Sequence, residues 1–333
     1  MPDYKFLTLL TFCTALPFTA FAEGQGVPIN YDALSFFEEP LAFEVGPATL
    51  SSNILIDQSA NYNFNSNKDT YNTRASGNFL LEMQLPNSWS VAAQYFARYD
   101  RLADNNERDE YTDNLALSVS DEWGTLAVGN VTSSAFEKAR RTRGFGNADL
   151  ANDNFLGALD QTGAFYSVRY NSYEASITAD QEGRAEAALS FERPIGKHVY
   201  FGSVRVRKGD TTESASTSDQ GDALGAAIVA KQTYANLQIS GQVGYEEVEI
   251  NNSKDDNDHV FGSVGILYKY GAYRFSADGG LGRYDGEDKR AFALGSRIDI
   301  ARGASLNLGL NYQYDNKTDT EDTTGITSIR YEF

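Results

Sequence analysis

The chain has 333 residues, a formal net charge of −18 and one cysteine. Such an excess of negative charge argues against nucleic-acid binding, because the phosphates of DNA or RNA would be repelled. The one cysteine, Cys13, lies in an N-terminal segment that we expect to be removed. The mature chain therefore has no disulfide, no cysteine-based metal site and no cysteine nucleophile.

Residues 1–22 have the pattern of a secretory signal peptide. Lys5 precedes an apolar run over residues 6–21, and residues 20–22 read Ala-Phe-Ala, an A-x-A cleavage site. A transmembrane helix is the alternative, but the run is short and contains Pro17. We expect export and cleavage after Ala22. Residues 23–47, which contain three prolines, then form a periplasmic lead-in, with a short strand at Leu41–Val45.

From residue 48 to the end, short segments alternate apolar with polar side chains. In residues 304–315, leucine and tyrosine occupy every second position, and serine, asparagine, glycine and glutamine lie between them. This period of two is typical of strands with one apolar face. We expect sixteen strands, over 48–63, 72–85, 89–100, 111–120, 125–131, 162–170, 173–179, 185–193, 198–207, 222–231, 234–248, 259–269, 273–284, 290–300, 304–315 and 323–333.

The connections between these strands also alternate. Those after the even-numbered strands have two to five residues, and most of those after the odd-numbered strands are longer and charged. Short turns at one rim and long loops at the other are typical of an outer-membrane barrel. Aromatic residues near strand ends, such as Trp89, Tyr170 and Tyr273, fit the girdles of such a barrel. A soluble periplasmic β-sandwich is the alternative, since its strands would alternate as well.

The longest interval without alternation is 131–161. Ser134 and Glu137 form a capping box, which predicts a short helix. Basic residues follow, among them Arg140, Arg141 and Arg143, and the interval continues with Asp149, Asp153 and Asp160. A long loop in a compact architecture is usually functional or disordered. We expect this one to fold into a pore and to narrow it.

Two motifs carry a resemblance to a known family. Residues 121–130 read Asp-Glu-Trp-Gly-Thr-Leu-Ala-Val-Gly-Asn, and the chain ends on an alternating strand with Phe333. In both, the sequence resembles the general porins of Gram-negative bacteria, although Asn130 stands where that family usually has a basic residue. The resemblance implies a 16-stranded antiparallel transmembrane β-barrel with a constriction loop after strand five, over 131–161. It also implies a homotrimer, set among outer-membrane lipids and lipopolysaccharide, that passes small hydrophilic solutes.

The resemblance further implies an arginine wall that faces acidic residues of the constriction loop. On this sequence, Arg74, Arg98 and Arg274 fit the basic wall, and Asp149, Asp153 and Asp160 fit the acidic side. The loop arginines have two alternatives. Arg140, Arg141 and Arg143 either extend the basic side or pair with Glu137 and with wall carboxylates such as Glu82. We expect no cofactor, no bound metal and no catalytic residue.

Two other functions compete with general diffusion. A barrel-based enzyme usually needs a histidine base beside a nucleophile. His198 and His259 are the only histidines, and they fall at opposite rims of the expected barrel. A substrate-selective channel for sugars or anions is the other alternative, for which Phe165, Phe201 and Phe261 point inward.

Overall fold

The computed structural model describes residues 41–103, 108–130, 141–142, 144–145, 162–210, 221–250, 257–284, 287–316 and 319–332, all within the unit Glu38–Phe333. These residues form strands, one short 3-10 helix and the turns between them. The strands are β1 (Leu41–Val45), β2 (Ala48–Asn63), β3 (Lys68–Gln84), β4 (Ser90–Ala103), β5 (Arg108–Asp121), β6 (Gly124–Asn130), β7 (Thr162–Tyr170), β8 (Tyr173–Asp180), β9 (Ala185–Ile195), β10 (His198–Asp210), β11 (Gly221–Tyr234), β12 (Leu237–Ile250), β13 (Asn257–Tyr270), β14 (Tyr273–Tyr284), β15 (Glu287–Ala301), β16 (Ala304–Asp315) and β17 (Thr320–Glu332).

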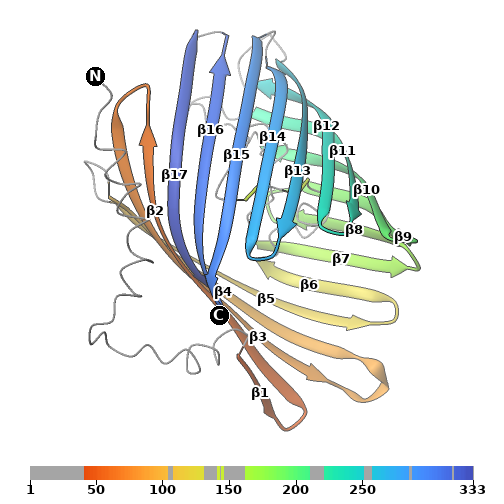
Figure 1. The fold of residues 1–333 in the computed structure, drawn as a ribbon. Helices are drawn as coiled ribbons and strands as arrows, with labels where there is room; N and C mark the ends of the chain where they lie inside the picture. The colour runs from red at the N-terminus through yellow and green to blue at the C-terminus, as the bar shows by residue number, and fades with distance from the viewer. Residues whose placement is uncertain are drawn as a thin grey trace, which may run out of the picture. The chain divides into compact units, whose positions relative to one another are not determined.

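Strands β2 to β17 form a closed barrel of sixteen antiparallel strands. Each strand pairs with the strand before it and the strand after it in the chain (Figure 1). The barrel closes where β17 pairs with β2, from Thr324 opposite Asn63 to Glu332 opposite Leu55. Closure gives every strand of the barrel a neighbour on both sides, so most of its backbone groups bond within the sheet. The expected 16-stranded antiparallel barrel is confirmed.

The first strand completes one edge of β2. Strand β17 accompanies β2 only as far as Leu55, and β1 pairs with the rest of the same strand, from Leu41 opposite Ser52 to Val45 opposite Ala48. The strand expected at Leu41–Val45 is therefore present, and it belongs to the sheet.

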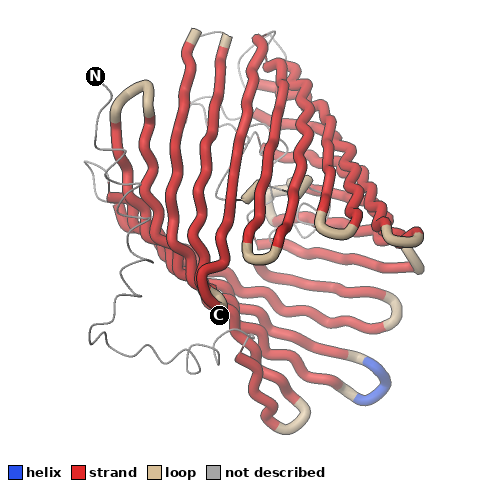
Figure 2. The backbone as a smooth tube through the Cα atoms, in the orientation of Figure 1, coloured by secondary structure: helices blue, strands red, loops and turns tan. Residues whose placement is uncertain are grey.

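The turns after β3, β5, β7, β9, β11, β13 and β15 share one rim and are short, as expected. The first of them contains the 3-10 helix Pro86–Ser88, drawn in blue in Figure 2. Several strand boundaries differ from the expected ones by one to four residues; for example, β12 begins at Leu237 and not at 234, because β11 continues to Tyr234. Ala235, with φ at 49°, is in the turn between them. In the part of the chain described, no helix is both long and apolar enough to span a membrane.

The barrel buries its polar side chains and exposes its apolar ones. On β12, Val243 is 60% exposed, whereas its neighbour Gln242 is 8% exposed and Ser240 is 3% exposed. The same alternation holds on β13, where Val264 is exposed and Ser263 is buried. A protein dissolved in water places its large apolar side chains inside. The outer face of this barrel is therefore suited to lipid and its inner face to polar groups.

A side-chain hydrogen bond and close backbone packing restrict which residues fit in and near the turn between β5 and β6. Asp121 accepts a hydrogen bond from the backbone N–H of Trp123 at 2.7 Å. Gly124 and Gly129 both have positive φ, 132° and 121°. A Cβ at Gly124 would meet the carbonyl oxygen of Ser167, and one at Gly129 would meet that of Leu115. Only glycine lets these backbones approach so closely.

Candidate functional site

The connection between β6 and β7 reaches the opposite wall of the barrel. Four of its residues, at 141–142 and 144–145, are described. The backbone N–H of Phe145 donates a hydrogen bond to the Ser276 hydroxyl on β14 at 2.8 Å. In a closed ring of sixteen strands, β14 lies eight strands from β6, which is half the circumference. The four described residues therefore lie inside the barrel against the wall opposite β6, and we call them the crossing segment.

An ion pair holds this crossing segment to the wall. The Arg141 guanidinium donates to the carboxylate of Asp278 on β14, and the two residues are only 2% and 1% exposed. Two glycines make the contact feasible. A Cβ at Gly265 would meet the Arg141 guanidinium, and one at Gly295 would meet the carbonyl oxygen of Phe145. Because both charges are buried, removing one of them would leave the other uncompensated.

A second set of buried charges lies in the inner wall from β9 to β13. Arg205 donates to Glu186 at 3.1 Å, and Arg207 lies 3.9 Å from Glu246. His259 Nδ1 is 3.3 Å from the other oxygen of Glu246. All five side chains are buried. Together with Arg141 and Asp278 we call them the buried network.

The inner wall from β14 through β17 to β4 carries charges of a different kind. Five arginines there keep part of their surface open, and we call this set the arginine wall. Their side chains are exposed by 41% (Arg74), 39% (Arg98), 32% (Arg274), 19% (Arg297) and 31% (Arg330).

Carboxylates lie between these arginines, and two of the carboxylates each bind two arginines. Arg74 donates to Asp100 at 2.7 Å, and Arg98 donates to the other oxygen of the same carboxylate. Arg274 and Arg297 likewise share Asp299, each at 2.9 Å. One shared acid thus holds two arginines close to each other, and the exposed part of each arginine faces the barrel interior.

The strand register explains this arrangement. Arg330 on β17 lies opposite Asp57 on β2, Asp57 lies opposite Arg74 on β3, and Arg74 lies opposite Asp100 on β4. The row alternates in charge around the barrel, and opposite charges in directly opposed positions stabilise a sheet. The same row therefore serves the fold and the inner surface.

The structure places some of the residues expected from the sequence and leaves others outside its description. Arg74, Arg98 and Arg274 lie on the inner wall, as their alternation indicates. Arg141 meets a wall carboxylate, but the partner is Asp278 and not Glu82. Arg140, Arg143, Asp149, Asp153 and Asp160 lie outside the described residues, as does the helix expected after Ser134. Sequence reasoning did not single out Arg297 or the shared carboxylates Asp100 and Asp299.

The two histidines lie far apart. His198 begins β10 opposite Tyr234 of β11, which lies opposite Leu237 of β12 and, through it, Tyr268 of β13. His259 is on β13, nine residues from Tyr268, which corresponds to about 30 Å along a strand. The two side chains therefore cannot act in one catalytic site. Among the described residues, no group of three or more His, Cys, Asp or Glu is placed to hold a metal ion.

The comparisons with solved structures agree on the architecture. A loop-deletion form of OmpT, an outer membrane protein of Vibrio cholerae, superposes with a TM-score of 0.68 at 12% identity, over 86% of this chain and 100% of that one. The anion-selective porin from Comamonas acidovorans gives 0.66 at 11% identity, with the same coverage. A trimer form of OmpT gives 0.65 at 13% identity, again over 86% and 100%. Identities this low show a shared fold alone.

The sequence comparisons add nothing further. No protein-family model and no curated protein sequence matches the chain.

Proposed function

We propose that the protein is an outer-membrane porin, a water-filled channel through which ions and small hydrophilic solutes diffuse down their gradients. It is exported with cleavage after Ala22, sits in the outer membrane among lipid and lipopolysaccharide, and works as a homotrimer. It acts as a channel and not as an enzyme.

One observation supports this proposal most directly. The closed barrel presents apolar side chains outward and polar side chains inward, strand after strand. A barrel of sixteen strands is wide enough to enclose an aqueous channel. The apolar outer face fits a bilayer, and the inner face offers the hydrogen-bonding groups that water and polar solutes need.

The selectivity of such a channel would come from its narrowest charged region. The arginine wall lies on one side of the interior, and the described residues of the β6–β7 connection contact β14. We assign Arg74, Arg98 and Arg274 to the basic side of the constriction and Asp149, Asp153 and Asp160 to the acidic side. We also assign Arg140, Arg141 and Arg143 to the constriction. Arg141 pairs with Asp278 on β14, so its role is to anchor the loop to the wall.

Planar-bilayer recording tests the proposal. Purified protein added to a lipid bilayer should give stepwise increases in conductance that scale with the salt concentration. Liposomes that contain the protein should swell at rates that fall smoothly as neutral solutes grow larger. Protein that inserts into the bilayer and gives neither steps nor swelling would refute a channel function.

A substrate-selective channel for anions is the second candidate, and the partly exposed arginines favour it. A size series that includes anionic, cationic and neutral solutes of matched mass separates the two. A general channel ranks these solutes by size. An anion-selective channel instead passes the anionic solute many times faster than its cationic counterpart.

A further inference from the structure

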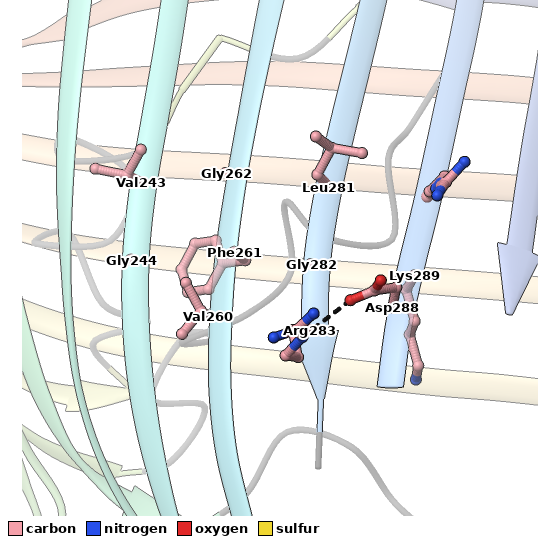
Figure 3. A pocket seen from close by; sticks show the side chains of 11 residues that line it. Val243, Gly244, Val260, Phe261, Gly262, Leu281, Gly282, Arg283, Asp288 and Lys289 are labelled. Atoms are coloured by element: carbon pink, nitrogen blue, oxygen red, sulfur yellow. Dashed lines mark hydrogen bonds and ion pairs between the residues drawn. The ribbon is translucent and has the colours of Figure 1, made fainter. Parts of the chain in front are cut away.

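The outer face of β12 to β16 is hollowed near the long-loop rim. Two adjoining hollows, of about 570 and 500 Å³, share Val243, Gly262 and Leu281 in their linings. Figure 3 shows the first hollow, with Val243, Val260 and Leu281 on neighbouring strands. Val243, Val260 and Leu281 are among the exposed apolar side chains of the barrel. The hollows therefore open toward lipid and not toward the interior.

These hollows form because valine or leucine on one strand lies opposite glycine on the next. Val243 lies opposite Gly262, which lies opposite Leu281, and in the next row Val264 lies opposite Gly279. A Cβ added at Gly279 would meet nothing within 4 Å. Aliphatic walls around such open spaces provide a surface that an alkyl chain can fill.

One charged side chain stands where the hollows meet. Arg290 lies opposite Leu281 on β14 and opposite Tyr314 on β16, and it alternates with the buried Ala291. It is therefore on the outward face, beside apolar neighbours. Arg290 lines both hollows and a third one, of about 400 Å³, that continues toward the rim. A cation on the lipid face is destabilising when it lies deep in the bilayer, unless it meets a counter-charge.

Other side chains bind the carboxylates around Arg290: an arginine binds one of them, and neutral tyrosines bind the other two. Arg283 donates to Asp288 at 2.9 Å, an ion pair drawn in Figure 3. Tyr312 donates to Glu321 and Tyr314 donates to Asp319, each at 3.3 Å. Arg290, by contrast, has no hydrogen bond or ion pair with any residue that the structure describes. Its planar guanidinium is suited to bind a phosphate through two N–H groups.

We propose that this groove binds lipid A, the phosphorylated glycolipid part of lipopolysaccharide, with one phosphate on Arg290 and acyl chains in the two hollows. The choice of lipid A rests on the proposed function, because in an outer-membrane porin the long loops face the outside, where that leaflet is lipopolysaccharide. An apolar groove that ends in an exposed arginine complements such a molecule in both shape and charge.

Native mass spectrometry of the detergent-solubilised protein tests the phosphate contact, with diphosphoryl lipid A as the added probe. We expect Arg290→Gln to lower lipid A retention about tenfold or more, which is the loss of one charge-assisted phosphate contact. Arg297→Gln is the matched control, since Arg297 is on the same strand but faces the interior. Equal retention by parent and Arg290→Gln would overturn the proposal.

Gly279→Leu tests the acyl-chain seat separately. The position has open space, so the barrel should fold, which a heat-dependent shift on an SDS gel verifies. A leucine there fills the hollow, and we expect lipid A retention to fall several-fold while Arg290 is intact. Unchanged retention of lipid A would contradict the binding of an acyl chain in this hollow.

Two further results would also overturn the assignment. One is retention of phosphatidylglycerol as strong as that of lipid A. The other is dissociation of oligomers by Arg290→Gln with no change in lipid binding, which would place a second copy of the chain in the groove. Conductance distinguishes this inference from the proposed function. Arg290→Gln should conduct like the parent, and a parent without conductance would refute the porin and leave the lipid measurement to stand separately.

Discussion

The buried network and the arginine wall are both charged surfaces of the same barrel interior, but they differ in exposure and in balance. In the buried network, Arg141, Arg205 and Arg207 face three carboxylates, and all of these side chains are almost fully enclosed. In the arginine wall, two arginines share one acid, and the guanidinium groups stay partly open. The first set joins strands and a crossing segment. The second presents charge to whatever occupies the interior.

This difference has electrostatic consequences. Charges removed from water interact strongly with each other, so a buried pair is sensitive to the loss of either partner. Exposed charges are screened and add little to stability, yet they set the local potential felt by a passing ion. Substitutions in the buried network should therefore change folding, and substitutions in the arginine wall should change selectivity.

The largest effect is expected at the pair that anchors the crossing segment. Arg141→Ala leaves Asp278 buried without its partner, and we expect a loss of about 3–5 kcal/mol in the free energy of unfolding. Urea denaturation of the refolded barrel in lipid vesicles measures it. The double variant Arg141→Met with Asp278→Leu should recover much of the loss, because neither charge then remains. A single variant as stable as the parent would contradict the anchoring role.

Substitutions in the arginine wall should change the ion selectivity of the channel. Arg74→Glu combined with Arg98→Glu should shift the anion-to-cation permeability ratio about fivefold toward cations, since a unit charge near 4 Å in water is worth about 1 kcal/mol. Reversal potentials in a salt gradient measure this ratio. Some stability should be lost as well, because the buried Asp100 loses both arginine partners, so folding of the variant is verified first by its heat-dependent shift on an SDS gel.

A matched control for this selectivity shift lies on the same strand. Arg101 on β4 faces outward, 3.9 Å from Asp109, and both side chains are exposed. Arg101→Glu should leave the reversal potential unchanged. If it shifts the potential as far as the wall variants do, the effect comes from overall charge and not from the arginine wall.

The smallest effect is expected from salt. Raising the salt from 0.1 M to 1 M shortens the screening length from about 10 Å to about 3 Å. The permeability ratio of the parent should therefore move toward unity, and the free energy of unfolding contributed by the enclosed Arg205–Glu186 pair should stay nearly constant. Conductance and denaturation at the two salt concentrations check both halves of this statement. A selectivity that does not depend on salt would point to a filter more enclosed than the arginine wall.

The sequence could predict the faces of the strands because alternation is a local property. Val243 and Gln242 are neighbours, and their exposures follow from the period of two alone. The inward positions of Arg74, Arg98 and Arg274 follow in the same way. The start of β12 was predicted three residues too early, because apolar residues continue on both sides of the turn.

The partners across the barrel could not be predicted. Asp100 and Arg98 share one face of β4 two residues apart, but Asp100 meets Arg74 only because of the register between β3 and β4, which alternation leaves open by steps of two. Asp278 meets Arg141 because a ring of sixteen strands brings β14 opposite β6, a property of closure and not of any local segment. The sequence therefore offered a wall carboxylate as one of two alternatives for Arg141, but not which carboxylate.

The shared edge of β2 has a consequence for assembly. One edge of this strand is divided between β1, which precedes it by a two-residue turn, and β17, the last strand of the chain. Strand β1 can pair with β2 as soon as these two neighbouring strands are synthesised. The rest of the same edge of β2 stays unpaired until β17, some 270 residues later in the chain, is available. Until then two sheet margins stay open to self-association, so the protein depends on being shielded until its final segment is delivered.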